Sequence, residues 1–232
     1  MRWLSVLIVV WFCSLQSFGQ AYFTYGYGSN FANVKGLNQF VENYNTSRSW
    51  LRTEMKPFSY VDGLTITFGA GLGGAWIETE YGFRGQKRFA DGIDAMGDDV
   101  TRQVKLKQGG LAMSVGGIYV DEGGGVAFGL RTAFSHQKIL TRLYETGMDK
   151  PDWEKYDLRF IANTGPALKI FLDGGGGALG TISLYYTFGL FKTNAYEIEA
   201  DVNHSNPVEK DKRFQNKNNV FGFNIAIGVY GT

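Results

Sequence analysis

The chain has 232 residues and a formal net charge of +1, with 23 Lys or Arg against 22 Asp or Glu. This balance argues against a nucleic-acid partner, which would need a strongly basic surface. The content of 32 Gly, 18 Phe, 13 Tyr and 5 Trp suits strands, tight turns and interfacial aromatic belts better than helices.

The N-terminus has the layout of a secretory signal peptide. Arg2 supplies the positive start, an apolar run follows from Trp3 to Phe12, and small residues precede a cleavage site after Gly19. The run is too short to span a membrane as a helix. We therefore predict a signal peptide over residues 1–19 and a single domain over 20–232. Cys13 lies within the signal, so the mature chain is expected to have no disulfide.

The stretch from Gly174 to Ala200 carries the main structural pattern. Apolar and polar residues alternate after a run of glycines, and successive side chains on a strand point to opposite faces, so the pattern predicts a strand with one apolar and one polar face. The apolar phase consists of Ile182, Leu184, Tyr186, Phe188 and Leu190.

The same alternation recurs along the mature chain. It predicts eight strands, at residues 21–29, 60–72, 75–89, 103–120, 126–145, 156–172, 179–199 and 220–230. Short Gly-rich turns alternate with longer loops at the junctions, as in outer-membrane barrels, where the turns are periplasmic and the loops extracellular. We therefore predict an all-β, eight-stranded antiparallel up-and-down transmembrane β-barrel with both termini in the periplasm.

Two of these strands depart from simple alternation. Val104 and Leu106 are out of phase with the apolar residues after Gly110, and one extra residue at Gly109-Gly110 would bring both sets to the lipid face. Pro166 cannot donate a hydrogen bond within strand 156–172. We predict a β-bulge at each place.

The signal, the alternating strands and turns, and the last strand from Val220 to Tyr230 resemble the small eight-stranded outer-membrane barrels of the OmpA/OmpX kind, in the version common in Gram-negative bacteria of the Bacteroidetes type. The last strand is similar to the C-terminal signal read by the barrel insertion machinery, although it ends in Gly231-Thr232 and not in an aromatic residue. The resemblance implies an integral outer-membrane protein that contacts outer-membrane lipid and is assembled by that machinery.

The polar phase of the strands carries charge. Eight strands leave an interior just wide enough for side chains to fill, and charges buried there need partners. We predict a closed lumen with a luminal charge network of Glu78, Glu80, Arg84, Lys105, Lys107, Arg131, Arg159 and Lys169. An ion path or a catalytic carboxylate is the alternative use of such residues.

The mature chain has two histidines, His136 and His204, each beside a serine. Ser135 and His136 point to opposite faces of a strand and cannot form a nucleophile–base pair, while His204-Ser205 is typical of a solvated loop. We expect no enzymatic activity, no cofactor and no metal site. The first alternative is a rim enzyme modifying lipid or peptide, in which a histidine has a carboxylate and a hydroxyl within reach. The second is a soluble lipocalin-like carrier, apolar inside and polar outside.

The first long loop contains apolar residues at helical spacing after Asn33, a candidate N-cap. This predicts a short amphipathic helix over about residues 34–45 in the first extracellular loop. Its apolar stripe consists of Val34, Leu37, Phe40, Val41 and Tyr44. We expect the stripe to dock on the barrel as a lid, with a surface for a protein partner or a helix lying in the outer leaflet as alternatives. The expected role is envelope structure, adhesion, or a subunit of a larger outer-membrane assembly.

Overall fold

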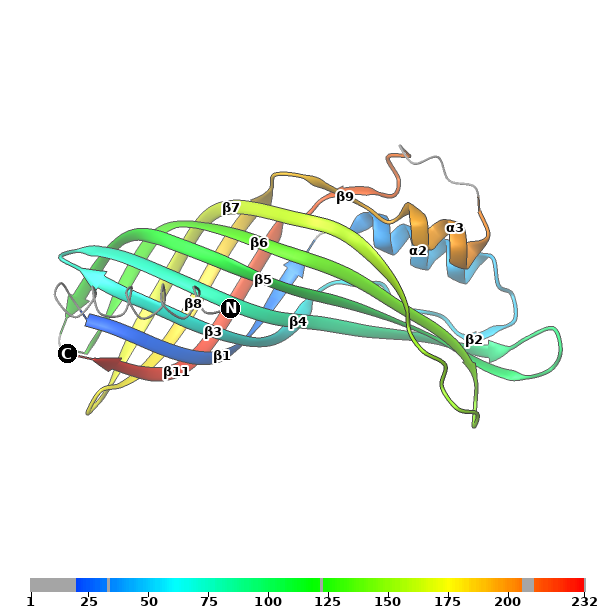
Figure 1. The fold of residues 1–232 in the computed structure, drawn as a ribbon, viewed down its shortest axis with the longest axis horizontal. Helices are drawn as coiled ribbons and strands as arrows, with labels where there is room; N and C mark the ends of the chain where they lie inside the picture. The colour runs from blue at the N-terminus through cyan, green and yellow to red at the C-terminus, as the bar shows by residue number, and fades with distance from the viewer. Residues whose placement is uncertain (1–19, 33, 122, 206–210, 232) are drawn as a thin grey trace, which may run out of the picture.

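Eight long antiparallel strands close into a ring, as the alternation predicts (Figure 1). The computed structural model describes residues 20–32, 34–121, 123–205 and 211–231, apart from the side chains of Leu158 and Arg159. The predicted signal peptide and Asn33 lie outside the described residues. The ring consists of β1 (Gln20–Ala32), β3 (Val61–Leu72), β4 (Ala75–Ile93), β5 (Asp99–Asp121), β6 (Gly124–Glu145), β7 (Glu154–Gly175), β8 (Ala178–Gly189) and β11 (Val220–Gly231).

Each strand pairs with its neighbour in this order, and β1 pairs with β11 to close the ring. The predicted strand 179–199 is too long, because β8 ends at Gly189 and the chain then leaves the ring. It continues through β9 (Lys192–Asn194) into the helix α3 (Tyr196–Asn203). Ile198 and Val202 are both buried and lie one helical turn apart, which favours a helix over a strand in this segment.

The register of the ring contradicts both predicted bulges. Gly109 and Gly110 pair in unbroken register with β4 and β6, so Val104 and Leu106 stay on the inner face. The pairs Thr164–Phe188 and Ala167–Tyr185 keep one register on the two sides of Pro166. The proline therefore interrupts the ladder to β8 without inserting a residue.

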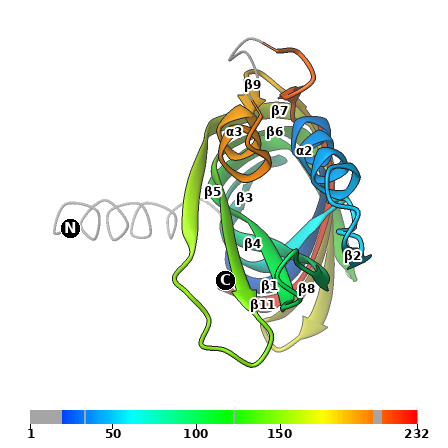
Figure 2. The same cartoon turned by 90° about the vertical axis from the view of Figure 1, so that its right-hand side faces the viewer.

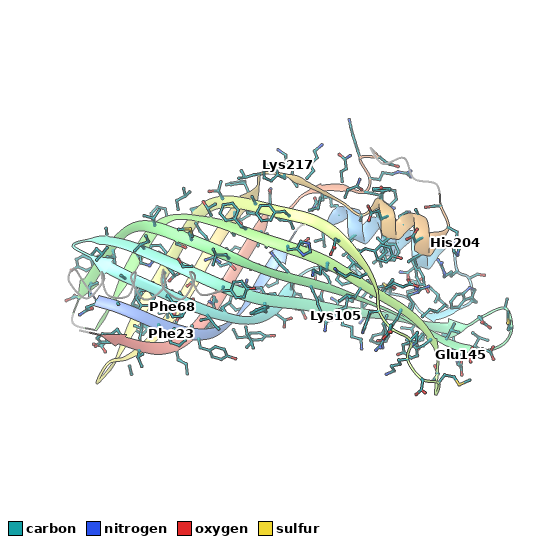
Figure 3. The ribbon with its side chains drawn as sticks, in the orientation of Figure 1. Phe23, Phe68, Lys105, Glu145, His204 and Lys217 are labelled. Carbon is teal, nitrogen blue, oxygen red and sulfur yellow. The ribbon has the colours of Figure 1, made fainter. Side chains whose placement is uncertain are left out.

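The outer surface of the ring is apolar. Phe128 and Ile227 are 64% and 73% exposed, whereas Thr65 and Thr67 face inward and are buried. Figure 3 labels Phe23 on the outer surface, where its ring lies 4.9 Å from that of Phe68. A soluble carrier would bury these side chains, so the lipocalin-like alternative is wrong. The closed ring and its apolar band are those of an integral outer-membrane β-barrel.

The strands of the ring differ in length. β4, β5, β6 and β7 have 19, 23, 22 and 22 residues, whereas β1, β3, β8 and β11 have 12 or 13. We call the end with the termini proximal and the opposite end distal. The long strands project at the distal end (Figure 1). These four strands exceed the 12-residue β3 by 7, 11, 10 and 10 residues, which at about 3.3 Å per residue lengthens them by roughly 20–35 Å.

Two helices pack inside the projecting wall. The predicted helix is present as α2 (Lys35–Thr46), and it lies beside α3 at the distal mouth (Figure 2). Short strands β2 (Leu51–Thr53) and β10 (Gln215–Lys217) flank them. We call α2, α3 and the distal parts of β4 to β7 the head. Among the described residues, no helix is both long and apolar enough to cross a membrane.

The head has its own hydrophobic core. All five residues of the apolar stripe are buried in one cluster with Val104, Leu106 and Ile139 of the strands and Ile198 of α3. The stripe is covered by the chain itself, which matches the docked arrangement and leaves no apolar face for a partner or a leaflet. This core is also why the inner face of β5 becomes apolar at its distal end.

Candidate functional site

The proximal part of the lumen is filled around one carboxylate. Glu78 forms an ion pair with Lys169, and both side chains are buried. The hydroxyl of Tyr22 donates to Glu78 Oε2 at 2.6 Å, and Trp76 Nε1 donates to that hydroxyl at 2.9 Å. Phe171 packs edge-on against Tyr22, with ring centroids 5.4 Å apart. Together these side chains plug the ring with a satisfied ion pair and aromatic rings.

The middle of the lumen is filled around a second carboxylate. Glu80 Oε1 accepts from a terminal guanidinium nitrogen of Arg131 at 2.8 Å and from one of Arg84 at 3.0 Å. The guanidinium carbon of Arg131 lies 4.3 Å from the centre of the Tyr185 ring. Tyr185 in turn donates to Asn30 Oδ1. Four strands, β1, β4, β6 and β8, thus contribute side chains to one buried network.

Little free space remains around these groups. The cavity beside Glu80 and Arg131 has a volume of about 30 Å³, which is one water molecule's share of the liquid. A wider hollow of about 520 Å³ opens at the proximal mouth and has Tyr22 and Phe171 in its lining. Side chains of the described residues therefore fill the lumen around Glu80 and Arg131.

The predicted luminal charge network divides into three groups. The structure places Glu78, Glu80, Arg84, Arg131 and Lys169 in the lumen. The side chain of Arg159 lies outside the described part. Lys105 and Lys107 are not luminal, because the unbroken register turns them to the outer face of β5. The luminal prediction for these two lysines is wrong, since the interior at their height is the apolar core of the head.

Polar side chains that the sequence pattern did not single out connect α2 and α3 within the head. Arg48 donates to the carbonyl of Val202 at 2.6 Å and to Asn203 Oδ1 at 2.9 Å, and its guanidinium lies over the Tyr44 ring at 3.9 Å. A cation at the C-terminal end of α3 is stabilised by the free carbonyls there. Partial burial lowers the pKa of Arg48 from its usual value.

The histidines lie apart from each other. His136 is on the outer face with Nε2 3.7 Å from Asp157 Oδ1, while Ser135 is buried and accepts from Gln108 Nε2 at 3.0 Å. His204 follows α3 (Figure 3). Among the described residues, no hydroxyl is hydrogen-bonded to either imidazole. Nowhere in the described part of the chain are three His, Cys, Asp or Glu residues grouped so that they could hold a metal ion.

His204 borders a hollow at the distal tip of about 410 Å³, together with Asp201, Glu154, Tyr156 and Trp50. The neighbouring Ser205 does not serve this histidine, because its hydroxyl donates to Glu199. The hollow thus brings together an imidazole, two carboxylates, two phenols and two guanidinium groups without an activated serine.

No protein-family model matches the chain, and no curated protein matches it. Several solved outer-membrane barrels have a similar fold. Ail, the attachment invasion locus protein of Yersinia pestis, is 10% identical with a TM-score of 0.46, over 92% of this chain and 99% of that one. Neisserial surface protein A is 11% identical with a TM-score of 0.40, over 91% and 97%. The outer membrane protease OmpT from Escherichia coli is 8% identical with a TM-score of 0.37, over 91% and 95%.

Proposed function

We propose that this chain is a non-enzymatic surface protein of the outer membrane, whose barrel is an anchor and whose head is the working part. The observation that supports this most strongly is the packed lumen, in which Glu78 and Glu80 are each held by buried basic side chains. A transport function needs a continuous path through the ring. The head instead places a folded surface on strands that extend roughly 20–35 Å beyond the shorter ones. Such a surface is suited to envelope structure, adhesion or assembly with a protein partner.

The proposal requires the head to lie outside the cell and both termini to lie in the periplasm. Short turns at the proximal end and long loops at the distal end support this orientation. The mature chain has no cysteine of its own if cleavage follows Gly19, so single cysteines can report the topology. Met96, which is 88% exposed at the distal end, and Gly123, in an open proximal turn, are suitable positions.

Intact cells that express Met96→Cys or Gly123→Cys would be treated with a membrane-impermeant maleimide. We expect labelling of Met96→Cys alone, and labelling of both after the outer membrane is permeabilised. Labelling of Gly123→Cys alone in intact cells would reverse the orientation and remove the proposal.

The sealed lumen is tested separately by conductance. The purified barrel in a planar lipid bilayer should give no stable conductance steps. A variant lacking residues 34–45 should also be silent, because the ion pairs lie below the head. Reproducible openings of porin size in the wild type would contradict an anchoring role.

The hollow at His204 supports a second candidate, an enzyme at the rim. Its imidazole and the carboxylates of Asp201 and Glu154 line one space. Incubation of surface peptides and lipids with the purified protein, and with His204→Ala, separates the two candidates. Turnover that disappears in His204→Ala would replace the non-enzymatic proposal.

A further inference from the structure

Like charges face each other on the outer surface of the ring. Lys87 on β4 lies directly opposite Lys105 on β5, and Lys107 on β5 lies directly opposite Lys138 on β6. Opposed like charges destabilise a sheet. Among the described residues, no acid lies within 4.0 Å of any of these four ammonium groups, so the repulsion is not offset within the described chain.

One acid, Asp157, stands at the edge of this group. Asp157 on β7 lies 3.4 Å from Lys155 Nζ and 3.7 Å from His136 Nε2. It pairs in register with Lys138, but its carboxylate is directed to the other two residues. We call Lys87, Lys105, Lys107, Lys138 and Lys155 the basic cluster.

The basic cluster borders a hollow. Gly85 lies opposite Lys107, and Gly109 lies opposite His136, on the same outer face. Because neither glycine has a side chain, the surface is lowered between the surrounding lysines. The resulting hollow has a volume of about 960 Å³, with Phe83 and Tyr81 on its proximal side. This is large enough for a phosphorylated sugar or a lipid headgroup.

The height of the cluster on the barrel identifies its surroundings. Tyr81 and Phe83 on β4 pack edge-on with ring centroids 4.7 Å apart. Phe134 on β6 and Phe160 on β7 stack with ring centroids 5.8 Å apart. Belts of exposed aromatic residues mark the level where hydrocarbon meets headgroups. The Lys107–Lys138 pair lies two residues along the strands beyond the pair of Gly109 and His136, which adjoins this belt. We infer that the ammonium groups lie at the depth of lipid phosphates. Figure 3 labels Lys105 between the two ends of the barrel.

We propose that the hollow is a binding site for the phosphorylated headgroup of an outer-leaflet lipid. Lys105, Lys107 and Lys138 donate to phosphate oxygens, and the aromatic pairs contact the upper part of the acyl chains. Hydrogen bonds between ammonium and phosphate are charge-assisted and stronger than neutral ones. A bound phosphate also replaces the lysine–lysine repulsion by attraction. The assignment of this lipid to the outer leaflet rests on the orientation given under the proposed function. Binding of the purified lipid in detergent does not depend on that orientation.

The test uses the mature protein refolded in a zwitterionic detergent. Native mass spectrometry would measure binding of lipid A carrying two phosphates and of the same lipid with both phosphates removed. The variant is Lys105→Gln/Lys107→Gln/Lys138→Gln. The matched control is Lys35→Gln/Lys192→Gln/Lys217→Gln, which removes three exposed lysines from the head side of the molecule.

We expect the wild type and the control to prefer the phosphorylated lipid. The cluster variant should bind it on the order of 100-fold more weakly, from about fivefold per lysine near a charged lipid surface. The variant should fold, because it loses only repulsion. Without lipid its melting temperature should be equal to or above that of the wild type. Phosphorylated lipid should raise the melting temperature of the wild type and leave that of the variant unchanged.

Three results would overturn the site. The first is equal binding of the two lipids by the wild type, and the second is wild-type affinity in the cluster variant. The third is inorganic pyrophosphate binding as tightly as the lipid, which would assign the hollow to a soluble anion. Correct topology in the cysteine-labelling experiment together with any of these results would leave the proposed function intact.

Discussion

Asn38 and Phe58 exchange two hydrogen bonds, so that one side chain of α2 pairs with a loop backbone as a neighbouring strand would. Asn38 Nδ2 donates to the Phe58 carbonyl at 2.9 Å, and the Phe58 amide donates to Asn38 Oδ1 at 2.8 Å. Asn45 makes the same two bonds with Met55, both at 3.0 Å. Two asparagines seven residues apart thus attach the segment 54–60 to the helix.

Asn38→Ala should loosen this attachment. The substitution leaves a buried amide and a buried carbonyl of Phe58 without partners, at about 1–3 kcal/mol for each group. Hydrogen exchange at the Phe58 amide should become faster by the corresponding factor. Gln39→Ala is the control, because among the described residues its side chain bonds to Glu42 and Asn43 within α2 and not to Phe58. Equal protection of Phe58 in both variants would contradict the role of Asn38.

Gly36→Ala should destabilise the head, although alanine is the better helix former. A methyl group at Gly36 would lie 2.2 Å from the carbonyl oxygen of Phe214, which is backbone and cannot turn aside. The gain in helix propensity is about 1 kcal/mol, while overpacking costs about 1–3 kcal/mol or more. Limited proteolysis of the head shows whether Gly36→Ala is stabilising or destabilising. The control is Lys35→Ala, at the exposed neighbouring position. A more resistant Gly36→Ala protein would show that α2 and the Phe214 segment can separate freely.

Lys169→Met should lower the free energy of unfolding by about 3–5 kcal/mol, because Glu78 would be a buried carboxylate without its cation. Adding Glu78→Gln to this variant removes the unpaired charge and should recover most of the loss. Guanidinium unfolding followed by tryptophan fluorescence gives both values. Additive losses in the double variant would mean that the two side chains do not act as a pair.

Leu184→Arg should impair insertion. Leu184 lies on the outer face near the middle of β8, is 37% exposed, and an arginine at the midplane costs about 2–4 kcal/mol. Leu143→Arg is the control outside the membrane, since Leu143 is 42% exposed on the distal part of β6, where it lines the hollow at His204 and not the lipid-facing surface. The difference is measured as the amount of folded protein in the membrane fraction, which electrophoresis of heated and unheated samples distinguishes from unfolded protein. Similar recovery of the two variants would contradict a lipid-facing surface at Leu184.

The ring could be predicted from the sequence because alternation is a local property that each strand repeats. Alternation alone does not predict whether the inner face is polar or apolar at each level along the barrel axis. Val104 and Leu106 have the spacing of a strand, but they face inward because the interior beyond the membrane is a helix-covered core. Keeping them on the lipid face led to the bulge at Gly109-Gly110, which the register excludes.

The same change from a polar lumen to an apolar core explains why the prediction for two lysines was wrong. Lys105 and Lys107 follow the outward phase of β5, and their charge alone suggested the lumen. Five lysines at the distal ends of four strands were the available signal, yet opposed pairs such as Lys107 and Lys138 depend on register between strands. The contacts of Arg48 and Asn38 were out of reach for a related reason, since their partners lie elsewhere in the folded head.

The hydrogen bond from Asn43 Nδ2 to Glu199 Oε1, 2.9 Å long, joins residues 156 positions apart and connects the first loop to the last. During biogenesis these loops can meet only after the strands between them have been laid side by side. We therefore expect the head to form last, as a step that follows completion of the barrel and not one that guides it. A chain stalled with an open seam would present the apolar stripe to proteases and chaperones, so the folded head marks a finished molecule.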